Sequence, residues 1–276
     1  MPDRSGGWGP ALAPAPASAP GRLEASLRGS RDEGAKLLVP YVTGGIDGWL
    51  EVVRALADAG ADAIEIGIPF SDPVMDGPTI QEASERALAA GATPTSILSE
   101  LRTVDAGVPL VAMTYYNLVF RAGEERFAAS LAEAGVAGVI LPDVPMEEQG
   151  AWTPAAEAHG IETVLLAGPI TPEDRLAAVC ERSRGFVYGV TLMGVTGERT
   201  ALGEVTANLA RRMKAVTDLP VIMGFGISGP EQAAAVAEHA DGVVVASAIM
   251  RRLLEGASVE DVHRFVSSLR AALDQE

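Results

Sequence analysis

The chain has 276 residues, 48% of them hydrophobic, which is enough to bury a large core as one α/β domain or two smaller ones. Its formal net charge of −16 argues against nucleic acid or an anionic membrane surface as a general partner. The single cysteine, Cys180, excludes an internal disulfide and is typical of a cytoplasmic protein, and no apolar run approaches the roughly 20 residues of a membrane span.

Residues 1–20 differ in composition from the rest of the chain, because they are rich in proline, alanine, glycine and serine. Pro14, Pro16 and Pro20 interrupt any apolar segment that a signal peptide would need. We expect a disordered tail here, with a targeting role as the alternative. A single catalytic domain over residues 21–276 should follow, with an extra helix before its first strand.

From Leu37 onward, short β-branched runs alternate with alanine-rich stretches of helical pattern such as Gly48–Ala59 and Pro230–Glu238. Residues 56–65 and 131–140 resemble each other, and both read as a helix end, a glycine and a strand start. Strands that alternate with helices pair in parallel, and near-continuous apolar strands are covered on both faces. The predicted strands are Leu37–Thr43, Asp62–Gly67, Leu110–Tyr115, Gly138–Leu141, Glu162–Ala167, Gly185–Val190, Val221–Phe225 and Gly242–Ala246.

Eight such units predict an α/β protein with the (β/α)8 fold, the TIM barrel. A doubly wound open sheet is the alternative, but the segment 43–48 after the first strand fits the dinucleotide-binding pattern poorly. In a barrel, chemistry takes place at the carboxyl ends of the strands and in the loops that follow. Polar and glycine-rich residues gather at these positions in this chain, which favours an enzyme.

The segment 63–78 carries two carboxylates, one in a strand and one in the loop that follows. Side chains alternate along a strand, so Glu65 shares a face with the small residues Ala63 and Gly67. Burial raises the pKa of a carboxyl group, so Glu65 could donate a proton near neutral pH, while Asp76 in a different environment could stay ionised. The alternatives are that hydrogen bonds satisfy a structural Glu65 and that Asp76 only forms a turn.

Two loops late in the chain predict a phosphate site. Gly224–Ser228 follows the seventh strand, and Ala246–Ala248 follows the eighth strand and opens a helix. Small residues allow backbone N–H groups to approach a phosphate, and a helix N-terminus adds a favourable dipole. Such donors need no lysine or arginine, although glycines that only make tight turns would give the same pattern.

Tyr188 shares a strand face with Phe186, from which it could donate a hydrogen bond to a substrate or to Glu65; core packing is the alternative. The loop Thr191–Leu202 could act as a lid, or could be an ordinary surface loop. No spacing of His, Cys or Asp suggests a metal site, and Cys180 is expected to be packed in a helix.

These motifs resemble the tryptophan synthase alpha subunit family from about Leu38 to Val266. The resemblance rests on Glu65–Pro73 with Asp76–Gln81, which is highly specific, and on four further segments in the same order and spacing. These are Tyr115–Leu118, Pro142–Pro145, Gly194–Gly197 and Gly224–Ser228.

The resemblance implies retro-aldol cleavage of indole-3-glycerol phosphate to indole and glyceraldehyde 3-phosphate, with no cofactor in this chain. It implies that Glu65 is the main acid and base, that Asp76 accepts the indole N–H and that Tyr188 lines the site. It implies an α2β2 heterotetramer with a beta subunit that binds pyridoxal phosphate. Implied substrate or phosphate contacts are Tyr41, Tyr115, Thr196, Gly197, Phe225, Gly226, Ala246 and Ser247. The implied partner surface is an exposed one made of Pro69, Asp72, Pro73, Asn117, Asp143 and Pro145.

The chain departs from the family pattern in two places. Gly45–Gly48 stands where the family usually has Gly-Asp-Pro, and Ala246 stands where a glycine commonly precedes the serine of the phosphate loop. These departures leave open a stand-alone indole-releasing lyase of a specialised pathway. Another phosphate-binding barrel would be expected to carry a metal-binding histidine or a catalytic lysine at a strand end, and a non-catalytic subunit would have no need of a buried Glu65.

Overall fold

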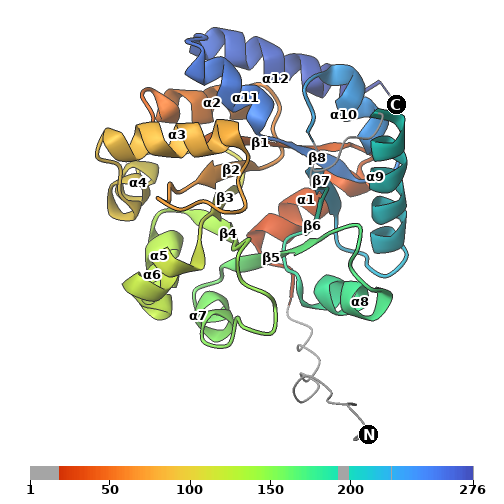
Figure 1. Cartoon of the computed structure of the whole chain (residues 1–276), viewed down its shortest axis with the longest axis horizontal. Helices are drawn as coiled ribbons and strands as arrows, with labels where there is room; N and C mark the ends of the chain where they lie inside the picture. Colours follow the sequence, from red (N-terminus) through yellow and green to blue (C-terminus); the bar gives the residue numbers. More distant parts are fainter. Residues whose placement is uncertain (1–18, 192–198, 225, 276) are drawn as a thin grey trace, which may run out of the picture.

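In a computed structural model of the chain, residues 19–191, 199–224 and 226–275 are described. Eight parallel strands close into a barrel in sequence order, with β1 paired to both β2 and β8. Helices surround the barrel, as Figure 1 shows along its axis. The strands are β1 (Leu37–Thr43), β2 (Ile64–Gly67), β3 (Leu110–Met113), β4 (Val136–Ile140), β5 (Glu162–Ala167), β6 (Val187–Val190), β7 (Val221–Gly224) and β8 (Gly242–Val245).

The helices lie in the connections between these strands, before the first and after the last. They are α1 (Arg22–Asp32), α2 (Trp49–Asp58), α3 (Pro78–Ala89), α4 (Pro94–Leu101), α5 (Tyr116–Ala122), α6 (Glu124–Glu133), α7 (Trp152–Ala158), α8 (Glu173–Arg182), α9 (Arg199–Lys214), α10 (Pro230–Ala237), α11 (Ser247–Leu254) and α12 (Val259–Leu273). The predicted barrel and the extra N-terminal helix are confirmed. The predicted tail lies outside the described residues apart from Ala19 and Pro20.

The predicted strands all form, with shifts of a few residues at their ends. The third strand stops at Met113, not at Tyr115, because Tyr115 is the N-cap of α5. The repeated helix–glycine–strand pattern is also present: Gly60 and Gly135 follow α2 and α6 with φ of 94° and 76°, a left-handed conformation that favours glycine. Gly135 is followed directly by β4, and Gly60 is followed by β2 after three residues.

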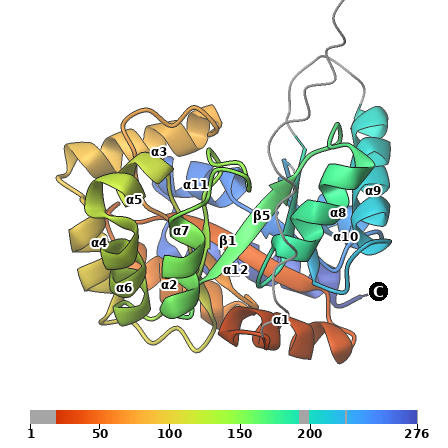
Figure 2. The same cartoon turned by 90° about the horizontal axis from the view of Figure 1, so that it is seen from below.

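The inside of the barrel is filled by one apolar cluster, and the space between strands and helices by two others. Leu23 and Leu27 of α1 belong to the inner cluster and are completely buried. Glu162, the first residue of β5, accepts hydrogen bonds from the N–H groups of Leu23 and Glu24 at 2.7 and 3.0 Å. The helix therefore closes the amino end of the barrel, as the view from below shows (Figure 2), and leaves the carboxyl end open for a site.

Candidate active site

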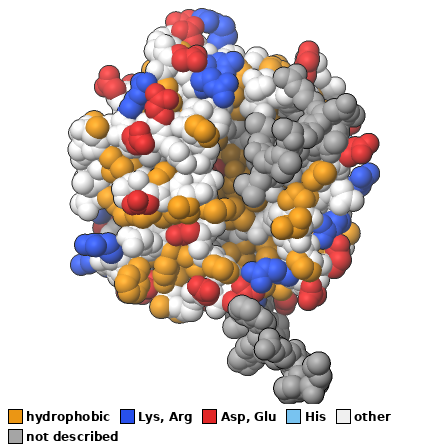
Figure 3. All heavy atoms as spheres, in the orientation of Figure 1, with side chains coloured by type: hydrophobic (Ala, Val, Ile, Leu, Met, Phe, Trp, Pro, Cys, Tyr) orange, Lys and Arg blue, Asp and Glu red, His pale blue; other side chains and the backbone are white. Residues whose placement is uncertain are grey.

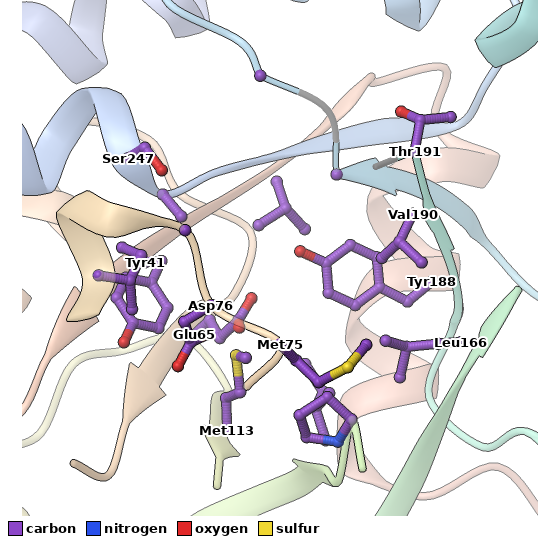
Figure 4. Close-up of a pocket in the computed structure, with 18 of the residues that line it drawn as sticks. Tyr41, Glu65, Met75, Asp76, Met113, Leu166, Tyr188, Val190, Thr191 and Ser247 are labelled. Atoms are coloured by element: carbon purple, nitrogen blue, oxygen red, sulfur yellow. The ribbon is translucent and has the colours of Figure 1, made fainter. Parts of the chain in front are cut away.

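The carboxyl ends of the strands surround a cavity of about 240 Å³. Hydrophobic side chains gather around the hollow in the middle of this face (Figure 3). Two carboxylates and two tyrosines lie in this otherwise apolar space (Figure 4). The lining residues are Tyr41, Glu65, Met75, Asp76, Gly77, Ile80, Met113, Ile140, Pro142, Leu166, Tyr188, Val190, Thr191, Gly224, Gly226, Ile227, Val244, Ala246 and Ser247.

Glu65 points into the cavity from the middle of β2, opposite Tyr41 on β1 and Val111 on β3. Its side chain is 1% exposed, and its Oε2 atom has no hydrogen-bond partner among the described residues. Burial, reinforced by the nearby charge of Asp76, raises the pKa of Glu65 to about 8. The carboxyl group is therefore protonated at neutral pH, as an acid that donates a proton must be.

Asp76 reaches the same cavity from the loop between β2 and α3. The loop is held in a turn by the Asp76 N–H, which donates to the Pro73 carbonyl at 3.2 Å, and by Gln81 Nε2, which donates to the Asp76 carbonyl at 2.9 Å. Burial raises the pKa of Asp76 to about 6, and a hydrogen bond with Tyr115 opposes that rise. Asp76 thus forms the turn and also gives the cavity a carboxylate that ionises before Glu65.

Two glycines make room for the two tyrosines of the cavity. A Cβ at Gly224 would lie 2.3 Å from the ring of Tyr188, and a Cβ at Gly67 would lie 1.9 Å from the hydroxyl of Tyr41. Burial raises the pKa of both tyrosines, and the charge of Glu65 adds to the rise. Both hydroxyls are therefore neutral donors, and the hydroxyl of Tyr41 lies 3.2 Å from Thr43 Oγ1.

The loops after β7 and β8 meet at one end of the cavity. Gly226 and Ser247 line both the inner cavity and a wider one of about 960 Å³ that continues outward from it. Ser247 is the first residue of α11, whose leading N–H groups have no acceptor within the helix. Ala246 has φ of −112°, so its side chain causes no backbone strain where the family commonly has glycine. Small residues and a helix N-terminus give this end the chemistry of a phosphate site.

Of the predicted site residues that the structure describes, Tyr115 lies outside the cavity wall. Tyr115 lies behind Asp76; its hydroxyl accepts a hydrogen bond from the Met75 N–H at 3.0 Å and bonds to Asp76. The predicted contacts at Thr196, Gly197 and Phe225 lie outside the described residues.

The predicted partner surface is mostly, but not wholly, exposed. Asp72, Asn117, Asp143 and Pro145 are exposed, and Pro73 is half-buried. The expectation of an exposed loop is wrong at Pro69, which is buried. Of the two prolines nearest the carboxyl end of β2, only Pro69 therefore lies in the protein interior, and the chain is exposed from Ser71 onward to Asp72.

Apolar residues of the cavity floor are absent from the residues predicted from sequence. Met113, Ile140 and Leu166 come from β3, β4 and β5 and line the side of the cavity below the carboxylates. The signal that could have found them is their position at strand carboxyl ends, on the inward face. Thr191 was considered only as the start of a lid, although it also lines the cavity.

The other reactive side chains are far less suited to chemistry. His159 lies 2.7 Å from Glu125 at the surface, and Cys180 is 2% exposed with its pKa raised to about 11 by burial. Within the described ranges, no group of three or more His, Cys, Asp or Glu side chains is arranged to hold a metal ion. None of the helices in the described part of the chain is long and apolar enough to cross a membrane.

The fold and the site define a barrel enzyme whose cavity combines two carboxyl groups of different pKa, apolar side chains and, at one end, small residues beside a helix N-terminus. The family model described as "Tryptophan synthase alpha chain" matches residues 27–273. A tryptophan synthase alpha chain of Streptomyces avermitilis is 43% identical, covering 90% of this chain and 92% of that protein. One of Methanosarcina mazei is 46% identical, covering 84% and 85%.

Solved structures agree with these relatives. The alpha subunit of tryptophan synthase from Legionella pneumophila superposes with a TM-score of 0.86 at 33% identity, over 94% of this chain and 100% of that one. Mycobacterium tuberculosis tryptophan synthase gives a TM-score of 0.86 at 38% identity, over 94% and 100%. The chain belongs to the tryptophan synthase alpha chain family. It is accordingly a carbon–carbon lyase of tryptophan biosynthesis, whose reaction is the cleavage of indole-3-glycerol phosphate.

Proposed function

We propose that Glu65 delivers and removes the protons of the retro-aldol cleavage. Its carboxyl group gives a proton to C3 of the indole ring, and the resulting carboxylate takes the proton of the side-chain hydroxyl. The bond between C3 and the side chain then breaks, the hydroxyl carbon becomes an aldehyde, and the electron pair returns to the ring. One proton is given and one is taken, so Glu65 ends as it began. The observation that carries this proposal is a fully buried carboxyl group whose Oε2 has no partner in the part of the chain that is described.

Asp76 is proposed to accept a hydrogen bond from the indole N–H. Protonation at C3 places positive charge on the ring nitrogen, so a nearby carboxylate stabilises the intermediate more than the substrate. Asp76 ionises at a lower pH than Glu65, and the two therefore hold different protonation states over an interval of pH. The neutral hydroxyl of Tyr188 lies across the cavity as a further donor (Figure 4).

We propose that the apolar and polar parts of the substrate bind to the apolar and polar parts of the cavity. The indole ring would lie against Met113 and Leu166, and the phosphate against the N–H groups around Gly226 and Ser247. Backbone donors suit this chain, because with a net charge of −16 the overall field attracts no anion. Tyr41 would contact the ring from the side of β1. No cofactor is needed for these steps, and we propose one catalytic domain over residues 21–276.

We further propose that the chain works in the cytoplasm as the alpha subunit of an α2β2 heterotetramer, and that pyridoxal phosphate belongs to the beta subunit. The proposed surface consists of the exposed Asp72, Asn117, Asp143 and Pro145 and the half-buried Pro73. Large apolar side chains on the same rim support a docking role: Val74, Phe120 and Ile170 are 80%, 67% and 95% exposed.

The test is to incubate the full-length protein with indole-3-glycerol phosphate and to measure released indole, with and without a tryptophan synthase beta subunit. Slow release that rises sharply with the beta subunit is expected. Fast release that the beta subunit leaves unchanged would indicate a stand-alone lyase. No release in either mixture from folded protein would contradict the proposed reaction.

A further inference from the structure

Thr191, the residue that follows β6, has a buried hydroxyl group that bonds to none of the described residues. The residue is 8% exposed, and its Oγ1 atom has no hydrogen-bond partner among the residues that the structure describes. Thr43 Oγ1 bonds to Tyr41, and Thr171 Oγ1 accepts from the Gly168 N–H at 3.0 Å. Thr114, which follows β3, also has a buried hydroxyl without a partner among these residues, but only Thr191 of the two lines the cavity. Leaving a buried hydroxyl unpaired costs free energy. A bound ligand would remove that cost.

The position of Thr191 indicates which part of a ligand it would meet. It lines both the inner cavity and the wider outer one, together with Gly226 and Ser247, whereas Glu65 lines only the inner cavity. In Figure 4, Thr191 and Ser247 lie in the upper part of the view, on opposite sides of the cavity, and Met113 and Leu166 lie lower. Thr191 therefore lines the part of the cavity that Gly226 and Ser247 also line, away from the apolar Met113 and Leu166.

We propose that the Thr191 hydroxyl donates a hydrogen bond to the phosphate group of the substrate, together with the N–H groups around Gly226 and Ser247. The proposal rests on the proposed function for the identity of the ligand. Its physical reason is the shortage of cations next to the inner cavity, whose lining residues include no lysine or arginine, whereas Arg251 and Arg252 line only the wider outer cavity. A phosphate held where the two cavities meet depends on neutral donors, and a buried hydroxyl is a strong one, because a hydrogen bond to a charged group is stronger than one between neutral groups.

The test compares Thr191→Val, which keeps the shape and removes the hydroxyl, with Thr191→Ser, which keeps the hydroxyl. Affinities for inorganic phosphate, glycerol 3-phosphate and indole are measured by calorimetry on the full-length protein. We expect Thr191→Val to bind both phosphate ligands about tenfold more weakly, Thr191→Ser to bind them like the wild type, and both variants to bind indole unchanged. The melting temperature of free Thr191→Val should equal or exceed that of the wild type, because an unpaired buried hydroxyl has been removed.

Three outcomes would overturn the proposal. Unchanged phosphate affinity in Thr191→Val would show that the hydroxyl makes no such bond. Weaker binding of glycerol 3-phosphate with unchanged binding of inorganic phosphate would place the hydroxyl on the glycerol chain. A lower melting temperature together with lost indole binding would show a structural role. Because these measurements need no turnover, they stay informative if the protein releases no indole, the result that contradicts the proposed reaction.

Discussion

The two ends of the barrel differ in whether their carboxyl groups have hydrogen-bond partners. At the amino end, three of them accept hydrogen bonds from backbone N–H groups: Asp62 from Leu38, Glu162 from Leu23 and Glu24, and Asp241 from Val221. Asp62 and Asp241 also pair with Arg270 and Lys214. At the carboxyl end, Glu65 Oε2 lacks a partner in the described ranges. A buried acid that the fold has satisfied is part of the structure, whereas one that the fold has left unsatisfied is available for chemistry.

The largest expected effect is the loss of activity, without loss of the fold, when Glu65 is replaced. We expect Glu65→Gln to lower the rate of indole release by about 10³-fold or more, because the amide cannot deliver a proton to C3. The fold should be kept. Since the pKa of Glu65 is raised in the folded protein, the unfolded chain loses this proton at a lower pH than the folded protein does, so the wild type loses stability as the pH rises from about 4.5 towards 8. Glu65→Gln should therefore gain stability relative to the wild type over that interval, as followed by thermal unfolding at several pH values.

The second expected effect concerns the space that Tyr188 occupies. A Cβ at Gly224 would lie 2.3 Å from the Tyr188 ring, so Gly224→Ala should displace the tyrosine and lower kcat/KM by about 10²-fold. Gly29→Ala is the matched control, because Gly29 is exposed in α1 and an added Cβ meets nothing within 4 Å. That variant should keep full activity and gain about 0.5–1 kcal/mol of stability. Equal activity of the two variants would contradict the role given to Tyr188.

The third prediction makes the same exchange of glutamate for glutamine at the amino end of the barrel, at Glu162. Glu162→Gln places an amide NH2 group against one of two backbone donors, and we expect it to lower the free energy of unfolding by about 1–2 kcal/mol. Burial also raises the pKa of Glu162, so relief of that desolvation offsets part of the loss. Activity per folded molecule should be unchanged. A large loss of activity without a loss of stability would contradict the purely structural role given to Glu162.

The smallest expected effect is the pH dependence of the wild type. The value of kcat/KM should rise as Asp76 loses its proton near pH 6 and fall as Glu65 loses its proton near pH 8. Steady-state rates of indole release between pH 5 and about 9 would measure this bell-shaped curve. A rate that continues to rise above pH 8 would show that Glu65 acts in its ionised form throughout.

The sequence was sufficient to predict the barrel, because the short β-branched strands, the helical stretches between them and the glycines after the helices are local patterns. It also predicted that Glu65 is buried, since both faces of its strand carry apolar or small residues. Asp76 was predicted as a candidate because the loop follows directly from that strand.

The remaining features depend on contacts between segments far apart in the sequence. The dependence of Tyr188 on Gly224 and of Tyr41 on Gly67 arises across neighbouring strands. The burial of Pro69 depends on how the loop packs after the barrel has closed. Thr191 gave no signal of its own, because a threonine at a strand end is ordinary until the surrounding structure shows that its hydroxyl has no partner.

The most direct test of the contrast between the two ends is the protonation of Glu65 itself. Carbon-13 labelling of the glutamate carboxyl groups, with Glu65→Gln used to assign the resonance, would follow its titration by NMR. A resonance that titrates near pH 8 would show that the buried acid is protonated at neutral pH, as its burial predicts. A resonance that titrates near or below 4.5, the ordinary value, would show that Glu65 is ionised and that another group protonates the indole ring.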